Sequence, residues 1–265
     1  MAFDMDRYKQ LCSRLDYGDL DLGAGFGRRP LRPEVLRCLR YMHDVEQHTT
    51  CYMRNLLNTR AHEDPQITEF LTLWNFEEHW HGEALGDVLR AHGEPGGAPR
   101  VAAMRRRLRN RVGDSPLVWL AMSSATRHFL AVHMTFGVIN EWTTQAGYAR
   151  LAAVADHDVL SELLRRIKRQ EGRHIDYYLT EARRFLDVGA GAQRTVRFFL
   201  RSLWRPVGAT VMPEPEIRHV VRTLFGDPPG REAAARIDRR IDSLPGLAGM
   251  DLMGGVLRRY AAAAA

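Results

Sequence analysis

The sequence predicts an all-α protein built around a four-helix bundle, with additional flanking and C-terminal helices. Stretches with the alternating pattern of β-strands are scarce, whereas long segments repeat apolar residues at every third or fourth position. A chain of 265 residues that is 45% hydrophobic is also long enough to bury a sizeable core. We expect one domain over residues 1–265, with the core bundle over about 33–190 and a C-terminal helical extension over about 193–265.

Four long helices are expected to form the bundle. They follow a loop rich in Gly and Pro at 18–33, and they span about 33–60, 65–92, 115–155 and 158–188. The stretch GEPGGAP at 93–99 interrupts the pattern and precedes a basic helix or turn, and glycines at 189–191 stop the fourth helix. Beyond residue 193, two short helical stretches separated by MPEPE and GDPPG are expected to form an appended layer.

The cysteines and the apolar runs indicate a cytoplasmic protein. The N-terminal stretch MAFDMDRYKQ has no apolar signal region, and the longest apolar runs, such as 117–122, are too short to span a bilayer. Three cysteines (Cys12, Cys38 and Cys51) without paired spacing support neither a disulfide framework nor a zinc site. We therefore expect a reducing compartment and no membrane insertion.

The net charge of +6 comes almost entirely from arginine and favours an acidic partner. The densest basic run consists of Arg105, Arg106, Arg107, Arg109 and Arg111. Such a run is most often a solvated helix face. Nucleic acid is not an expected partner, because no aromatic stacking motif or DNA-binding module accompanies the arginines.

A Glu-x-x-His motif occurs on the second and on the fourth predicted helix, as Glu78 to His81 and as Glu171 to His174. Residues three apart lie on one face of a helix, so each pair can present a carboxylate and an imidazole to the same ion. The motif alone is weak evidence, since a third copy lies outside the bundle at Glu216 to His219. For that third copy we expect a solvated surface or a salt bridge rather than a metal.

The order of the acidic residues strengthens the metal interpretation. Glu46 precedes the first motif by 32 residues (46 to 78), and Glu141 precedes the second by 30 (141 to 171), so the chain contains the same unit twice. Two single glutamates and two Glu-x-x-His pairs are the ligand set of di-iron and di-manganese four-helix proteins. Four carboxylates can neutralise two divalent ions, and these oxygen and nitrogen donors suit iron or manganese. The alternative for any one of the six residues is a solvated surface or a salt bridge.

The helices that carry these motifs resemble the soluble acyl-acyl carrier protein desaturases, which are ferritin-like di-iron carboxylate proteins. The sequence WNFEEHWHG at 74–82 resembles that family's W-x-x-E-E-x-x-H-G helix, and IKRQEGRH at 167–174 resembles its I-x-x-x-E-x-R-H helix. The stretch 53–59 is also similar, and the resemblance covers roughly residues 35–190.

The resemblance implies two iron ions per chain, with manganese possible, held by Glu46, Glu78, His81, Glu141, Glu171 and His174. It further implies that Thr144 relays protons near the O₂ site, for which the alternative is a threonine bonded to its own backbone. Where the family has an aspartate supporting a ligand histidine, this chain has Gln170. The implied partners are an acyl chain on acyl carrier protein, a ferredoxin-type electron donor and a second copy in a homodimer.

The function expected from these residues is an O₂-dependent oxidase that desaturates a carrier-bound fatty acyl chain. An apolar channel between the helices, lined by Phe129, Met134 and Phe136, would hold the chain. One alternative is a di-iron monooxygenase that hydroxylates or N-oxygenates a substrate of a specialised pathway. Another is a non-catalytic ferritin-like protein that binds iron.

Overall fold

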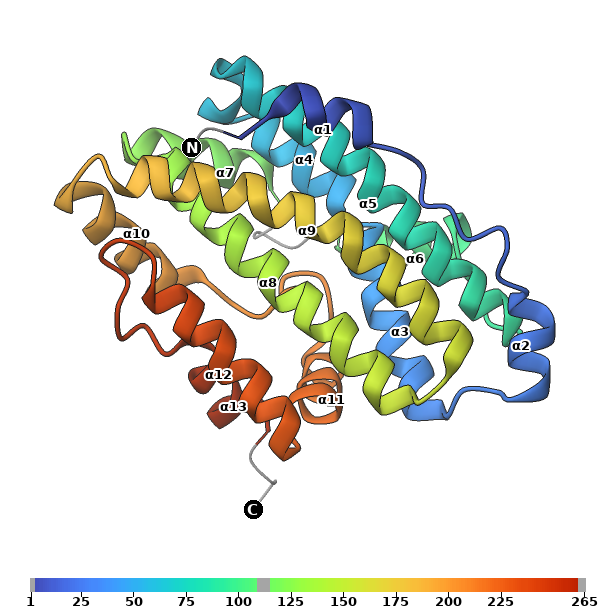
Figure 1. The fold of residues 1–265 in the computed structure, drawn as a ribbon. Helices are drawn as coiled ribbons and strands as arrows, with labels where there is room; N and C mark the ends of the chain where they lie inside the picture. Colours follow the sequence, from blue (N-terminus) through green and yellow to red (C-terminus); the bar gives the residue numbers. More distant parts are fainter. Residues whose placement is uncertain (1–2, 109–114, 262–265) are drawn as a thin grey trace.

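The computed structural model describes residues 3–108 and 115–261 (Figure 1). Over these ranges the regular structure is helical and contains no strand, which confirms the predicted all-α class. Four helices form the bundle, and most of their ends lie close to the predicted residues. They are α3 (Pro33–Glu46), α5 (Pro65–Ala91), α8 (Phe129–Ala155) and α9 (Asp158–Leu186).

The bundle consists of two helical hairpins, α3 with α5 and α8 with α9. The hairpin of α8 and α9 closes through Asp156, whose left-handed backbone (φ 48°) reverses the chain within two residues. In the other hairpin, the start of α3 lies beside the end of α5, where the Leu31 amide donates to His92 Nε2 at 3.0 Å. Each hairpin therefore brings a single glutamate opposite a Glu-x-x-His pair.

Local sequence explains where the motif helices begin. Asp64 caps α5, because its carboxylate accepts from the amides of Gln66 and Ile67 while Pro65 occupies the first helical turn. Helix α8 is apolar around most of its circumference, since it packs on α9 on one side and on C-terminal helices on the other. This central position places Glu141 of α8 in the interior.

The segment expected to be one helix over 33–60 is instead two helices, α3 and α4 (Thr49–Leu57), followed by the short 3-10 helix η1 (Arg60–Glu63). The break follows Glu46, whose carbonyl accepts from the Thr49 hydroxyl at 2.6 Å. The Gln47 side chain also packs where a Cβ at Gly82 would lie, 2.7 Å from Gln47 Nε2. The break leaves Glu46 on the last turn of α3, at the mouth of the bundle interior.

The prediction of one helix over 115–155 was also wrong, because α7 (Pro116–Ala125) ends before α8 begins. Thr126 between them has an extended backbone, and its hydroxyl accepts from the His128 amide at 3.1 Å. This local hydrogen bond competes with the helical pattern that would have continued through residues 126–128. Helix α7 is therefore a separate helix that packs against α4 and α8.

The C-terminal extension contains more helix than the two stretches expected. The prolines of MPEPE and GDPPG lie at the N-cap or in the first turn of a helix, where a missing amide costs nothing, rather than between helices. The extension packs against α8 and α3, as the orange and red ribbons of Figure 1 show. Its helices are α10 (Ala190–Leu203), α11 (Glu214–Phe225), α12 (Pro228–Asp242) and α13 (Leu252–Tyr260).

Two short helices before the bundle were not predicted, α1 (Met5–Leu11) and α2 (Leu22–Arg28), of which α2 lies within the expected loop at 18–33. Both pack against α5, and α2 also contacts α9. Asp21 caps α2 by accepting from the Ala24 amide at 2.8 Å. The N-terminal segment thus covers the side of the bundle opposite the C-terminal extension (Figure 1).

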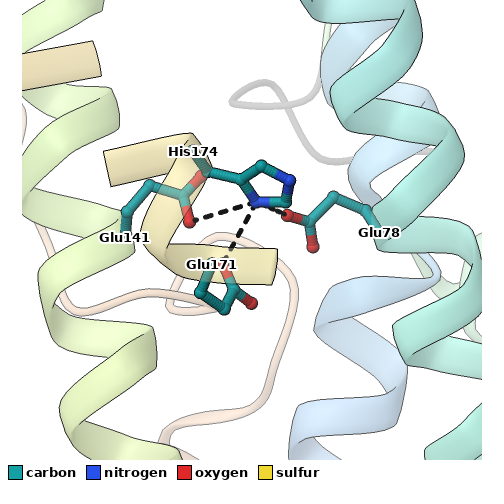
Figure 2. A group of neighbouring side chains, drawn as sticks. All are labelled: Glu78, Glu141, Glu171 and His174. Atoms are coloured by element: carbon teal, nitrogen blue, oxygen red, sulfur yellow. Dashed lines mark hydrogen bonds and ion pairs between the residues drawn. The ribbon is translucent and has the colours of Figure 1, made fainter. Parts of the chain in front are cut away.

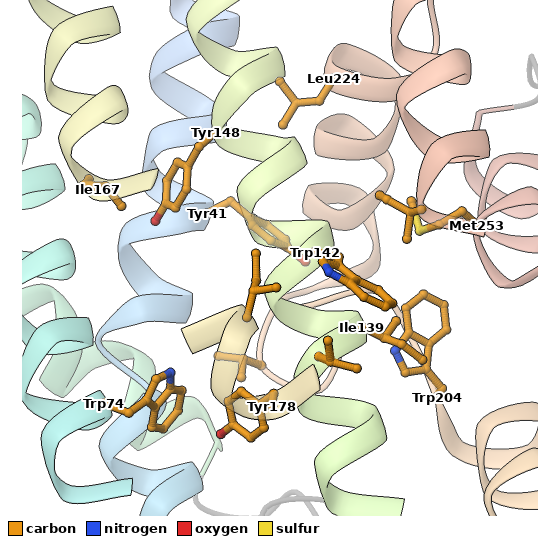
Figure 3. Close-up of a cluster of buried hydrophobic side chains, with 14 of the residues drawn as sticks. Tyr41, Trp74, Ile139, Trp142, Tyr148, Ile167, Tyr178, Trp204, Leu224 and Met253 are labelled. Carbon is orange, nitrogen blue, oxygen red and sulfur yellow. The ribbon is translucent and has the colours of Figure 1, made fainter. Parts of the chain in front are cut away.

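One hydrophobic cluster runs through the described chain from Met5 to Tyr260, and Figure 3 shows the part of it around Trp142. The basic run begins on α6 (Ala98–Leu108), where Arg105, Arg106 and Arg107 are exposed as expected for a solvated face. The two other arginines of the run, Arg109 and Arg111, lie outside the described residues. Among the helices that the structure describes, none has both the length and the apolar character needed to cross a membrane.

Candidate metal centre

The six predicted ligands meet in the interior of the bundle. Each of the helices α3, α5, α8 and α9 contributes at least one of them, and every one of these side chains is buried. The set divides into two overlapping groups whose ligand atoms lie within 4.8 Å of one another. These groups are Glu78, Glu141, Glu171 and His174, shown in Figure 2, and Glu46, Glu78 and His81.

Both glutamates of the repeated motif face both histidines. The His174 Nδ1 atom lies 3.0 Å from Glu78 Oε1 and 3.2 Å from Glu171 Oε2 (Figure 2). The His81 Nδ1 atom lies 3.6 Å from Glu78 Oε2 and 3.4 Å from Glu171 Oε1. Glu78 and Glu171 therefore stand between the histidines, where each can offer one oxygen to either of two neighbouring ions. The single glutamates stand to the sides, Glu141 beside His174 at 3.9 Å and Glu46 in the group of His81.

Two buried atoms of the cluster show that its donors suit a cation. His81 Nδ1 and Glu171 Oε1 face each other at 3.4 Å, yet neither has a hydrogen-bonding partner of acceptable geometry among the described residues. A buried polar atom without a partner is costly. Oxygen and imidazole donors that converge without satisfying one another are suited to a cation, so these buried clusters can hold a metal ion.

The charges of the metal-free cluster balance through protons. Burial, together with the neighbouring carboxylates, raises the pKa values of Glu46 and Glu141, which favours their protonated forms. Burial also opposes ionisation of Glu78 and Glu171, but close contacts with His81 and His174, and for Glu78 also with Glu46, outweigh it and lower the pKa values of these two carboxyls. The same carboxylates raise the pKa of His81 to about 9 against the effect of burial. Two divalent ions can replace these protons and keep the interior neutral.

The outward-facing nitrogen of each histidine has its own acceptor. His81 Nε2 lies 2.8 Å from Gln170 Oε1, and His174 Nε2 lies 2.9 Å from Glu77 Oε2. Because the Gln170 amide nitrogen donates to the Ser13 carbonyl at 3.0 Å, its oxygen is the end that faces His81. Both histidines thus carry a proton on Nε2, which turns Nδ1 toward the cluster.

Glu77 is a functional candidate that the sequence analysis missed. It is fully buried, and it accepts from Tyr8 at 3.0 Å, from the Ser13 amide at 3.4 Å and from Arg173 as well as from His174. Burial opposes its ionisation, but His174 and Arg173 lower its pKa. The sequence signal that could have identified Glu77 is its position directly before Glu78, together with the position of Arg173 directly before His174.

The two single glutamates also have donors that spacing alone did not reveal. Trp74 Nε1 donates to Glu141 Oε1 at 3.0 Å, and the Tyr148 hydroxyl makes a short hydrogen bond to Glu46 Oε1. Tyr148 follows Glu141 by seven residues, two helical turns, so it lies on the same face of α8. Each donor holds one oxygen of its carboxylate, and each carboxylate also offers an oxygen to a group that can hold a metal.

A cavity of about 380 Å³ opens onto one side of the cluster. Glu46, Glu78 and Glu141 line it, whereas both histidines lie behind them, away from it. Its walls are mainly apolar and come from all four bundle helices, from α4, α7 and α10, and from the segment after α10. Large lining side chains include Trp119, Met122, Phe129, Phe136, Tyr178 and Trp204. Phe129 and Phe136 were expected in such a channel and line it. Met134 was also expected there but does not line it; its side chain is buried in the core.

Thr144 lines this cavity one turn beyond Glu141. Its hydroxyl forms no hydrogen bond with another described residue, while the hydroxyl of the neighbouring Thr143 donates to its own helix at the Ile139 carbonyl, 2.8 Å away. The alternative for Thr144 was a hydroxyl bonded to the backbone of its own helix. Thr143 makes such a bond, and Thr144 does not. The Thr144 hydroxyl is left available to whatever enters the cavity.

The third Glu-x-x-His motif lies outside the cluster, and its glutamate forms a salt bridge, one of the two roles expected of it. Glu216 pairs with the Arg37 guanidinium at 2.8 Å, and His219 Nε2 lies 3.0 Å from the Glu34 carbonyl oxygen. Both contacts attach α11 to α3, far in sequence from the bundle motifs. Neither residue belongs to the groups that can hold a metal.

Comparisons of the chain with protein-family models, with curated proteins and with solved structures find no match. The geometry of the bundle and of its buried cluster is therefore what any functional assignment rests on.

Proposed function

We propose that this chain is a di-iron oxidase that uses O₂ to desaturate a fatty acyl chain carried on acyl carrier protein. The observation that carries the proposal is that Glu78 and Glu171 each face both histidines, directly beside an apolar cavity. When bound, two iron ions would supply the electron-transfer chemistry that reduces O₂. The ligands would be Glu46, Glu78, His81, Glu141, Glu171 and His174.

In the overall reaction a saturated acyl chain loses two hydrogens, and two further electrons and two protons complete the reduction of O₂ to two molecules of water. A ferredoxin-type donor is the proposed source of the electrons. The protein would exclude water through the apolar walls and place one part of the chain beside Glu141. Trp74 would keep Glu141 oriented through its indole N–H. Thr144 would hold a proton on its hydroxyl at the edge of the cluster.

The remaining partners follow from the same proposal. Acyl carrier proteins are acidic, and the net charge of +6 suits such a partner because opposite charges speed and orient an encounter. We propose a homodimer in the cytoplasm as the working form. Replacement of the family's aspartate by Gln170 changes the charge behind His81, which would tune the reactivity of the centre rather than its ability to bind metal.

The proposal is tested by a single turnover of the iron-loaded, chemically reduced protein with O₂ and a panel of saturated acyl carrier proteins. Mass spectrometry of the released acyl group should show a loss of two hydrogens. A gain of oxygen derived from ¹⁸O₂ would assign the protein to the monooxygenases instead. No product with any substrate, together with loading of many iron ions per chain, would indicate an iron-binding protein without catalysis.

A further inference from the structure

The segment between α10 and α11 forms one side of the cavity, although it belongs to the C-terminal extension rather than to the bundle. Residues 203–211, here called the C-terminal wall, include eight that line the cavity. These are Leu203, Trp204, Arg205, Pro206, Val207, Gly208, Thr210 and Val211. The extension is therefore part of the candidate site and is more than an outer layer.

The C-terminal wall is attached at two points next to candidate ligands. Trp204 Nε1 donates to Asn140 Oδ1 at 3.3 Å, and Asn140 directly precedes Glu141. The Tyr41 hydroxyl donates to the Val207 carbonyl at 2.5 Å on the side of α3, the helix that ends in Glu46. The wall is thus positioned relative to the cluster itself.

Gly208 lets the C-terminal wall approach α3 closely. Its backbone is left-handed (φ 84°), and a Cβ there would lie 2.5 Å from Val45 Cγ2 and 2.6 Å from the Tyr41 hydroxyl oxygen. Such distances are shorter than van der Waals contact, so only glycine fits without a shift. The Trp204 ring is 5% exposed and lies in the buried cluster with Ile139 and Trp142 (Figure 3).

We propose that the C-terminal wall determines substrate specificity, and that the Trp204 indole limits the length of the apolar segment that the cavity accepts. This inference rests on the proposed role of the cavity as the substrate site. The cavity follows α8 from Phe129 to Thr144, a rise of about 22 Å at 1.5 Å per residue, and Trp204 is held against α8 within that span. Trp204 is a specificity-determining residue, and Asn140 is a positioning residue that holds it.

Straight-chain alcohols from hexanol to tetradecanol test the inference when their binding to the full chain is measured by calorimetry. Affinity should rise about fourfold for each added methylene while the chain still gains contact, and then reach a plateau where its end meets the wall. Trp204→Ala should move the plateau to chains longer by two or more methylenes. Trp204→Phe, which keeps a ring without the N–H, should move it by one at most. The matched control is Phe198→Ala on α10, because that aromatic side chain is 65% exposed and should leave the plateau unchanged.

A plateau at the same chain length in wild type and Trp204→Ala would overturn the inference. Should Trp204→Ala fail to fold, Val211→Phe can be measured instead. It adds bulk to the same wall and should move the plateau to shorter alcohols. An unchanged plateau in that variant would equally overturn the inference. Binding of the alcohols requires no turnover. A shifted plateau without any acyl product would support the role of the C-terminal wall and refute the proposed reaction. Turnover with an unshifted plateau would support the reaction and refute the role of the wall.

Discussion

His81 Nε2 lies 2.8 Å from Gln170 Oε1, and the same amide donates to the Ser13 carbonyl at 3.0 Å. A carbonyl can only accept, so the contact with Ser13 fixes which end of Gln170 faces the histidine. His81 must then donate from Nε2, which leaves Nδ1 as the nitrogen for a metal ion. A neutral amide therefore does the orienting that a carboxylate does for His174, where Glu77 is the acceptor.

Gln170→Leu should weaken metal binding by about 10- to 100-fold, because it removes the acceptor that orients His81. A titration against a competing chelator measures this affinity. Gln66→Leu is the matched control, since Gln66 is exposed at the start of α5 and its side chain is remote from the cluster. Equal affinities for wild type and Gln170→Leu would show that the amide does not orient the ligand.

Glu171→Ala and Glu141→Ala should each abolish stoichiometric binding of two metal ions. Glu171 faces both histidines, so its loss affects both ion positions, and Glu141 supplies a carboxylate beside His174. Elemental analysis after iron loading measures the stoichiometry. Two irons retained in either variant would refute the ligand assignment.

The control for these variants is the third Glu-x-x-His motif. Glu216→Ala and His219→Ala should keep two ions per chain, because their partners are Arg37 and the Glu34 carbonyl rather than the cluster. Loss of metal from either control variant would mean that metal loss does not distinguish the bundle motifs from a Glu-x-x-His motif outside the bundle.

The sequence identified all six cluster residues because ligand spacing follows from helix geometry alone. A Glu-x-x-His pair lies on one helical face wherever the helix is, and its repetition with a preceding glutamate located the bundle. Glu77 and Tyr148 were missed, since their roles depend on which neighbours the fold brings near. The sequence shows a carboxylate beside Glu78 and a tyrosine two turns after Glu141. It does not show which residues the fold brings into contact with them, so their roles could not be inferred.

Helix ends were predicted less well than helix interiors. The break at residues 47–48 contains neither Gly nor Pro, and it depends on the Thr49 hydroxyl and on the packing of Gln47 against Gly82. In the C-terminal extension the opposite error occurred, because prolines that start α11 and α12 were taken to separate helices. The role of the wall at 203–211 was likewise invisible, since only the fold brings it to the cavity.

Metal binding should weaken steeply as the pH falls. Burial holds protons on Glu46 and Glu141, and carboxylates hold one on His81, whose pKa is raised to about 9. An incoming ion must displace such protons, so the affinity should change by more than tenfold per pH unit near neutral pH. An indicator dye in weak buffer should record proton release on addition of Fe²⁺. Binding without proton release would contradict the charge balance proposed for the cluster.

Thr144→Val should reduce product formation by about 100-fold or more while leaving two metal ions bound. The substitution keeps the shape of the side chain and removes the hydroxyl that faces the cavity. Thr143→Val is the matched control, because the Thr143 hydroxyl serves only the Ile139 carbonyl among the described residues. Equal rates for the two variants would refute a proton-handling role for Thr144.

His133 should make the fold less stable in acid. It is 2% exposed, and burial lowers its pKa from 6.5 to about 3, so the folded protein leaves it neutral where the unfolded chain binds a proton. Stability is therefore lost as the pH falls from 6.5 toward 3, by about 2 kcal/mol at pH 5. Urea unfolding at pH 7 and pH 5 measures the loss, which should be smaller by about that amount in His133→Phe. The exposed His79→Gln variant should keep the wild-type difference, and equal losses in wild type and His133→Phe would mean that His133 takes up its proton without unfolding.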